Sequence, residues 1–281
     1  GQIDDLRIWS DARTISEIQE YMHKELVGNE SNLVAYWKMS NGTGTSLTDN
    51  SSNSNTGTLA NMANGDWVTS YAVIGDLGSS YKTDVEGIWS VSGTSESDAS
   101  TGLTMTVSSA LSTGNFAVFG NNNTSGETSV DLGSVASTAR TGRIWQVDES
   151  GTVAATIKID LSEATGLAYG TGTASNYRLL YRSGTSGAFS SAATGSSISG
   201  DVVTFNSVSL QDGYYAMGTQ GDATLPVELT SFELLETRND GITLQWVTES
   251  EIHNLGFNLD RKTPITDWSQ IASYITHPEL Q

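Results

Sequence analysis

From Tyr71 onward, the chain is a succession of short apolar segments separated by clusters of Gly, Ser and Asn. This spacing is typical of β-sandwiches and not of units in which strands alternate with helices. The 29 Gly residues and the abundance of Ser, Thr and Asn fit many short strands and their turns. The sequence therefore predicts an all-β chain of tandem β-sandwich modules.

One segment near the N-terminus departs from this pattern. Thr14 and Glu17 form a capping box, in which each side chain accepts a hydrogen bond from a free backbone N–H group at the helix start. The apolar residues that follow recur at helical spacing along one stripe: Ile15, Ile18, Met22 and Leu26. We expect one short amphipathic helix here, ending at Gly28, between strands at residues 2–9 and 33–39.

The charge balance limits the classes of partner. The 281 residues carry 13 Lys and Arg against 32 Asp and Glu, for a net charge of −19. Such a surface repels phosphate groups, which argues against nucleic acid and anionic bilayers and favours a glycan or a surface protein. The absence of Cys excludes disulfides, thiolate catalysis and zinc–thiolate sites. No apolar run approaches the roughly 18 residues of a membrane helix, so we expect no membrane insertion.

Composition shifts divide the chain into three parts. We expect module boundaries that give residues 1–70, 71–222 and 223–281, the last boundary marked by Pro226. An aromatic-Ala-apolar-Gly pattern recurs at residues 71–75, 116–120 and 215–218, and residues 87–91 resemble residues 143–147. This echo indicates either an incomplete tandem repeat or convergence of similar sandwich strands.

The N-terminal part resembles a known family. Residues 1–9, 12–18 and 33–39, followed by Gly42–Thr45, Asp49–Asn53 and Gly57–Leu59, are similar to the closing section of a laminin-G-like, concanavalin-A-like jelly roll. The resemblance implies a lectin-type fold, and related jelly rolls often carry calcium. The earlier strands are missing, so either they precede residue 1 or a second copy opens at Leu33 and stays incomplete. Since residue 1 is Gly and no leader follows it, we expect a mature segment or a fragment.

Two further resemblances cover the rest of the chain. Residues 143–151, 157–161 and 177–181 resemble a β-sandwich of surface and secreted proteins from Bacteroidetes-type bacteria. Residues 225–232, 244–246, 248–251 and 254–257 resemble the first half of a fibronectin-type-III-like domain. In such proteins that domain usually precedes a tail read by the type nine secretion pathway. These resemblances imply an extracellular or cell-surface location.

Catalytic patterns find little support. His23, His253 and His277 lie in unrelated segments, and no Gly-x-Ser-x-Gly, phosphate-loop or His-Glu-x-x-His motif is present. Asp4 and Asp5 are adjacent, so on a strand they point to opposite faces and do not flank one sugar bond. We expect Asp5 to pair with Arg7, Asp4 to meet a loop or solvent, and the chain not to be an enzyme.

Two binding sites are candidates. Asp49, Asn53 and Asn55 are spaced for an oxygen-rich turn that could bind Ca²⁺, although Asp and Asn also favour turns by bonding their own backbone. Tyr36, Trp37 and Trp67 could stack on the apolar face of a sugar ring, although aromatic residues in short strands often belong to the core.

These observations give one main functional hypothesis. We expect a non-catalytic segment of a large secreted or cell-surface bacterial protein, used for adhesion or glycan binding, with the later modules as spacers. The alternatives are the accessory region of a secreted polysaccharide-degrading enzyme, whose catalytic domain lies outside this chain, and a stalk without a ligand. Because strands of the N-terminal jelly roll are missing, we also expect exposed strand edges and ready aggregation of this chain.

Overall fold

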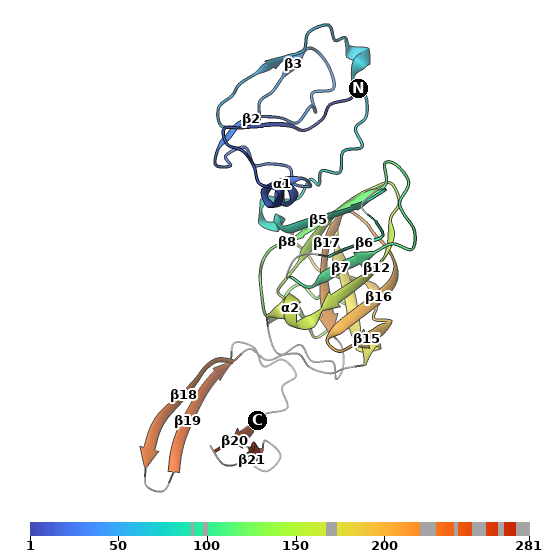
Figure 1. Ribbon diagram of the computed structural model, residues 1–281. Coiled ribbons are helices and arrows are strands. Elements are labelled where there is room, and N and C mark those ends of the chain that lie inside the picture. Colours follow the sequence, from blue (N-terminus) through green and yellow to red (C-terminus); the bar gives the residue numbers. More distant parts are fainter. Residues whose placement is uncertain are drawn as a thin grey trace.

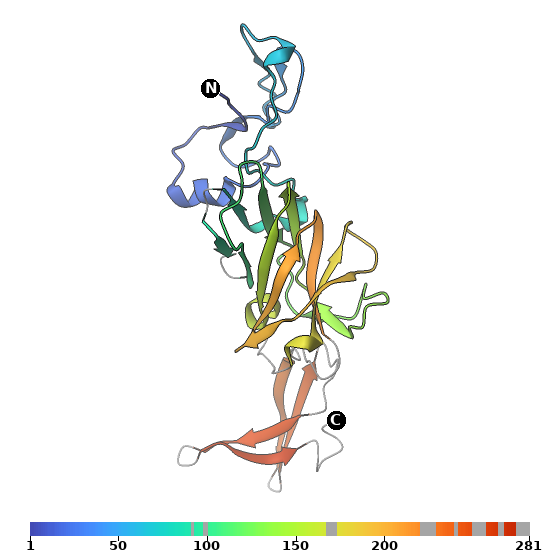
Figure 2. The ribbon, with the colours of Figure 1, turned by 90° about the vertical axis from the view of Figure 1, so that its right-hand side faces the viewer.

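A computed structural model confirms the all-β prediction (Figure 1). Most elements are strands, and the described residues form two α-helices, α1 (Ile15–Tyr21) and α2 (Leu161–Thr165). The N-terminal unit, residues 1–70, and the sandwich, residues 71–219, follow one another along the molecule (Figures 1 and 2). The structure describes residues 1–90, 93–97, 101–166, 173–219, 229–238, 241–248, 257–263 and 267–273.

The sandwich consists of two antiparallel sheets. The first contains β5 (Thr83–Trp89), β8 (Phe116–Asn121), β9 (Glu127–Thr128), β10 (Ala139–Thr141), β11 (Trp145–Ser150), β13 (Tyr177–Arg182), β14 (Ser190–Thr194) and β17 (Gly213–Thr219). Its main path runs β14-β13-β17-β11-β8-β5. The second runs β15 (Ser197–Ser199), β16 (Val202–Ser209), β12 (Ala154–Asp160), β7 (Leu103–Thr106) and β6 (Ser95–Ser97).

The main hydrophobic core lies between these two sheets. Alternate residues of each strand point inward, because side chains along a strand have a period of two. Trp145, Phe119 and Tyr177 from the first sheet meet Met105 and Phe205 from the second, and all five side chains are buried. Part of the opposite face of the first sheet is covered by the connection from the N-terminal unit, where Leu77 packs on Val85 and Val118. Another part is covered by a second cluster that includes Phe189 and Leu132.

The positions that the sequence echo matches differ in the face of the sheet to which they point. Trp89 lies opposite Phe116 in the β5–β8 pair, as Trp145 lies opposite Tyr215 in the β11–β17 pair. Yet Trp145 and Tyr215 belong to the main core, whereas Phe116 packs on the opposite face of the same sheet. Because a shift of one residue turns a side chain to the other face, the matching positions are not equivalent in the sheet.

The N-terminal unit is held by a small core. Its strands are β1 (Leu6–Trp9), β2 (Leu33–Trp37), β3 (Ser46–Leu47) and β4 (Gly57–Thr58), paired β1–β2 and β3–β4. Leu26, Leu33 and Tyr36 are buried together, with Trp9 and Tyr21 against them. Helix α1 begins with the predicted capping box at Thr14.

The extent and face of α1 differ from the prediction. The helix ends at Tyr21, well before Gly28, and Ile15 and Ile18 are exposed. Leu26 reaches the core from the segment after the helix. The apolar stripe is therefore divided between an exposed helix face and a buried turn.

Short helices complete the fold. The second helix, α2, is not among the predicted elements; Asp160 caps its N-terminus, and Gly166 ends it in the left-handed conformation. Three 3-10 turns lie at η1 (Asn64–Asp66), η2 (Ser79–Tyr81) and η3 (Ala174–Asn176). Within the described ranges, no helix is long and apolar enough to span a membrane.

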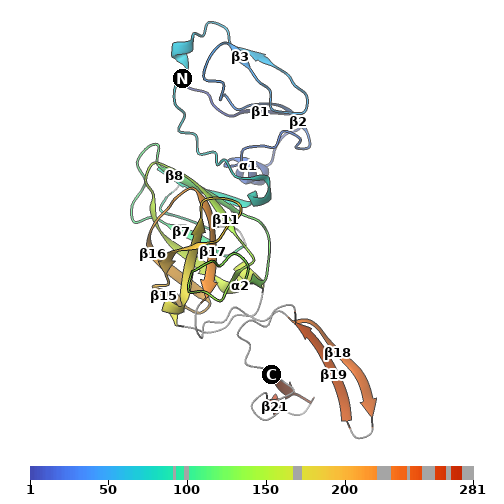
Figure 3. The same ribbon diagram turned by 180° about the vertical axis from the view of Figure 1, so that it is seen from behind.

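The C-terminal part contains two hairpins (Figure 3). They are β18 (Leu229–Arg238) with β19 (Gly241–Thr248), and β20 (Asn258–Arg261) with β21 (Ser269–Ser273). The ring of Trp246 lies between Phe232 and Phe257, 6.3 and 5.5 Å away. The predicted boundary at Pro226 lies outside the described residues.

Candidate ligand groove in the N-terminal unit

Three adjoining cavities form a groove along the N-terminal unit, which we call the Trp67 groove. Their volumes are about 250, 450 and 180 Å³. All three are lined by Asp4, and the second shares Trp67 with the first and Lys38 with the third. The groove runs between the start of the chain, the residues after β2, and the connection to the sandwich.

Trp67 is the aromatic residue of the groove. It follows η1, where the carboxylate of Asp66 accepts a hydrogen bond from the N–H of Ala63 at 2.8 Å. The indole Nε1–H donates to the carbonyl oxygen of Gly44 at 3.1 Å. Trp67 is therefore fixed at its polar end while the residue remains half-buried. Apolar side chains share the same cavity: Ile3, Met39, Leu59, Met62 and Val68.

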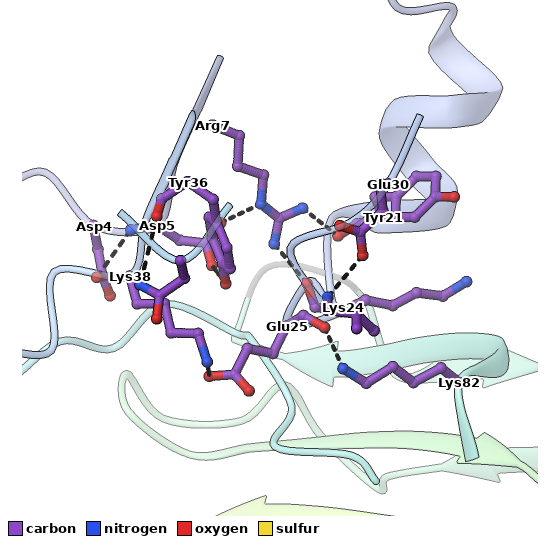
Figure 4. Close-up of polar contacts among 12 residues, drawn as sticks. Asp4, Asp5, Arg7, Tyr21, Lys24, Glu25, Glu30, Tyr36, Lys38 and Lys82 are labelled. Atoms are coloured by element: carbon purple, nitrogen blue, oxygen red, sulfur yellow. Dashed lines mark hydrogen bonds and ion pairs between the residues drawn. The ribbon is translucent and has the colours of Figure 1, made fainter. Parts of the chain in front are cut away.

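The middle of the groove is polar. Asp4, Lys38, Ser40 and Ser70 line both the second and the third cavities. Lys38 follows β2 directly, and its ammonium group lies 2.6 Å from a carboxylate oxygen of Glu25. The carboxylate of Asp4 accepts a hydrogen bond from the N–H of Asp5 at 2.9 Å (Figure 4). Donors and acceptors thus stand next to the apolar section.

A network centred on Arg7 (Figure 4) adjoins the groove, since its members Asp5 and Tyr36 line the third cavity. As predicted, Arg7 pairs with Asp5. Its guanidinium also donates to the carbonyl oxygens of Tyr21 at 2.6 Å and Lys24 at 2.5 Å. The hydroxyl of Tyr36 donates to Asp5 at 2.8 Å. Burial, followed by the interaction with Asp5, raises the pKa of Tyr36 well above its ordinary value, so this hydroxyl stays a donor.

The three predicted stacking residues have different surroundings. Tyr36 is 0% exposed and borders only the third cavity, so stacking by Tyr36 stays a prediction that its burial does not support. The strand carries its side chain inward, onto Leu26 and Leu33. Trp37 is half-buried beside Gly57, and its Nε1–H donates to the carbonyl oxygen of Asn55 at 3.1 Å. Of the three, only Trp67 lines the first cavity of the groove, where most of the apolar side chains lie.

The predicted calcium ligands form a hydrogen-bonded turn. The carboxylate of Asp49 accepts bonds from the backbone N–H groups of Tyr36, Ser51 and Asn55 at 2.5–2.8 Å, and from the hydroxyl of Ser51 at 2.9 Å. Burial raises the pKa of Asp49, but these hydrogen bonds together outweigh it, so the pKa lies below its ordinary value.

The two asparagines of this turn bind the backbone of β2. The amide of Asn53 donates to the carbonyls of Leu33 and Val34 at 3.0 Å, and that of Asn55 donates to Val34 at 2.9 Å. Across the part of the chain that is described, no group of three or more His, Asp or Glu side chains could hold a metal ion. Calcium binding at Asp49, Asn53 and Asn55 stays a prediction. The hydrogen bonds of this turn to the backbone are another reason for these three residue types to occur here.

Sequence reasoning misses the polar part of the groove. Lys38 and Ser40 stand just after the aromatic strand β2, and Ser70 lies in the connection to the sandwich. Alternating polar residues at a strand end are a usable signal for Lys38 and Ser40. Ser70 is brought to them by tertiary structure alone.

The comparisons with known proteins concern the sandwich and not the groove. A domain family of unknown function, DUF8202, matches residues 90–214. These residues span most of the two packed sheets, from the end of β5 into β17. No curated protein and no solved structure matches the chain. The sandwich is thus similar to a family whose function is unknown.

Proposed function

We propose that this chain is a non-catalytic, glycan-binding segment of a large secreted or cell-surface bacterial protein, and that the Trp67 groove holds the sugar. The observation that carries the proposal is the half-buried indole of Trp67, which donates through Nε1 to Gly44 and shares its cavity with several apolar side chains. A sugar ring has an apolar face that packs on an aromatic ring and a rim of hydroxyls that need polar partners.

The polar section supplies those partners. Ser40 and Ser70 provide hydroxyls, Asp4 an acceptor and Lys38 a donor, next to Trp67 along the same groove. Because three cavities adjoin, the groove favours several linked sugar units over a single one. Asp5 is engaged by both Arg7 and Tyr36, which supports a binding role rather than hydrolysis for the acids at this end.

The remaining modules act as spacers in this proposal. The resemblances of the sandwich and of the C-terminal part to modules of exported bacterial proteins support a place at the cell surface or outside the cell. A spacer needs a rigid core and no ligand, and the continuous core between the two sheets meets the first requirement.

A glycan array tests the proposal. The 281-residue chain is applied in calcium buffer and in EDTA, together with its Trp67→Ala variant. Trp268→Ala serves as the matched control, because Trp268 is 70% exposed and lies outside the groove. We expect binding that Trp67→Ala weakens by about tenfold or more and Trp268→Ala leaves unchanged. No binding by folded protein in either buffer would contradict the proposal.

A further inference from the structure

Residues 23–25 and the connection near Gly75 hold the N-terminal unit to the sandwich. The N–H of Gly75 donates to the carbonyl oxygen of His23 at 2.9 Å, and Lys24 and Gly75 form a parallel β-bridge. The ammonium group of Lys82, which directly precedes β5, donates to the carbonyl oxygen of Glu25 (Figure 4). These contacts come from one short segment after α1, so the junction depends on how that segment is held.

The imidazole of His23 is the side chain at the centre of this junction. The residue is 5% exposed, and its ring lies 4.7 Å from the ring of Trp89. Gly87 makes room for it, since a Cβ atom at Gly87 would lie 3.1 Å from the imidazole. Nδ1 is 2.8 Å from the carbonyl oxygen of Val73, and because a carbonyl only accepts, the proton is on Nδ1.

Charged groups surround His23 without forming an ion pair to it within the described structure. They line the same cleft, of about 680 Å³, between α1 and β5. From its own segment come Glu20 and Lys24, which pair with each other at 3.5 Å. The remaining charged residues come from β5, the residue before it and β6: Lys82, Asp84, Glu86 and Glu96.

Burial therefore governs the proton affinity of this ring. It lowers the pKa of His23 below the ordinary value, and the bond to Val73 opposes this only in part. Burial also raises the pKa of Glu96, so this neighbour becomes neutral more readily as the pH falls. A neutral Glu96 no longer offsets the positive charge of a protonated His23.

We propose that His23 is a pH-sensitive latch, which holds the N-terminal unit on the sandwich when it is neutral and releases it when it is protonated. A released His23 is solvated and titrates near its ordinary pKa of about 6.5. As the pH falls below this value, the released form takes up a proton before the docked form does, because the docked ring has the lower pKa. Docking of the N-terminal unit is therefore at full strength above about pH 6.5 and weakens as the pH falls toward the pKa of the docked ring. The latch does not depend on what the Trp67 groove binds.

Distance measurements between two spin labels test the latch. The chain has no Cys, so Thr58→Cys in β4 and Ser199→Cys in β15 give one exposed label on each side of the junction. His253 and His277 are replaced by Gln in every sample, which leaves His23 as the one titrating imidazole. We expect a narrow distance distribution at pH 8 and a broad or longer one at pH 5, while circular dichroism shows the strands intact.

His23→Asn is the matched control, because its amide can donate to Val73 as Nδ1 does and takes up no proton. We expect its distance distribution to be the same at both pH values. The His23 protein itself is also followed by the NMR titration of its imidazole, which needs no substitution at the latch. The proposal is overturned if the distances of the His23 protein are unchanged at pH 5, or if His23→Asn changes equally.

Discussion

At the scale of single residues, Arg7 links three segments of the N-terminal unit that lie far apart in sequence. It joins Asp5 on its own strand to the carbonyl oxygens of Tyr21 and Lys24 after α1. The side chains of Arg7 and Asp5 are nearly buried, so water does not replace these bonds. Removing one partner of such a network leaves unpaired polar groups, which is more costly than removing the whole network.

Arg7→Ala should therefore destabilise the N-terminal unit by about 3 kcal/mol, and Arg7→Lys by less, because lysine keeps the charge but not the planar donors. Hydrogen exchange measured by mass spectrometry resolves the effect by segment. We expect faster exchange in β1 and β2 and unchanged exchange in β12 and β16. Equal protection of β1 in both proteins would show that Arg7 contributes little.

The sequence pattern predicted which side chains pair with each other better than it predicted which side chains are exposed to solvent. Alternation along a strand placed Asp5 and Arg7 on one face, and they do pair. The same sequence pattern did not reveal that Tyr36 is buried and Trp67 half-buried, because each depends on what covers the residue. The covering segments come from other parts of the chain, and local sequence does not encode their approach.

At the scale of elements, α1 shows that capping and packing are separate matters. The capping box fixes where the helix starts, and its bonds are local, so sequence predicted them. Where the helix ends depends on tertiary contacts, since Arg7 binds the carbonyl of Tyr21 and the following segment turns toward the sandwich. The exposed stripe therefore contributes little to the fold.

Substitutions along this stripe should differ in their effect. Leu26→Ala removes a buried side chain and should lower the free energy of unfolding of the N-terminal unit by about 3 kcal/mol. Ile18→Ala removes an exposed side chain and should change it by about 0.5 kcal/mol or less. Urea denaturation followed by tryptophan fluorescence compares the two, and equal losses would mean that α1 packs through Ile18.

Strand β1 is an unprotected edge within the described structure. It pairs with β2 on one side, and Leu6 and Ile8 are exposed. Exposed edges with apolar side chains promote association between chains, and a charged side chain suppresses it. Ile8→Lys should therefore reduce self-association, measured by light scattering over a concentration series. Scattering equal to that of the unmodified chain would show that association takes place elsewhere.

At the scale of the whole molecule, the sandwich gives the chain a rigid centre and the groove gives it a function to test. Sequence predicted the sandwich because turn residues and alternation repeat regularly over residues 71–219. It did not settle whether the internal echo was a repeat, because the face to which Trp89 or Trp145 points is set by pairing register. Only the assembled sheet shows that the two tryptophans differ.

The groove could be predicted only in part. Trp67 was recognisable as an aromatic residue of the N-terminal part, whereas its groove neighbours Lys38 and Ser70 come from segments more than thirty positions apart. The connection that carries Ser70 also holds Val73 and Gly75, which bind His23. Groove and junction thus share one segment of chain.

The most direct measurement concerns the indole signals of the seven tryptophans. The protein is labelled with ¹⁵N at tryptophan, assigned with Trp67→Ala and Trp268→Ala, and titrated with the oligosaccharide that binds best on the array. The account predicts that the Nε1–H signal of Trp67 shifts with saturation, while those of the buried Trp145 and the distant Trp268 stay in place. Saturable binding that leaves the Trp67 signal unmoved would contradict the assignment of the ligand to this groove.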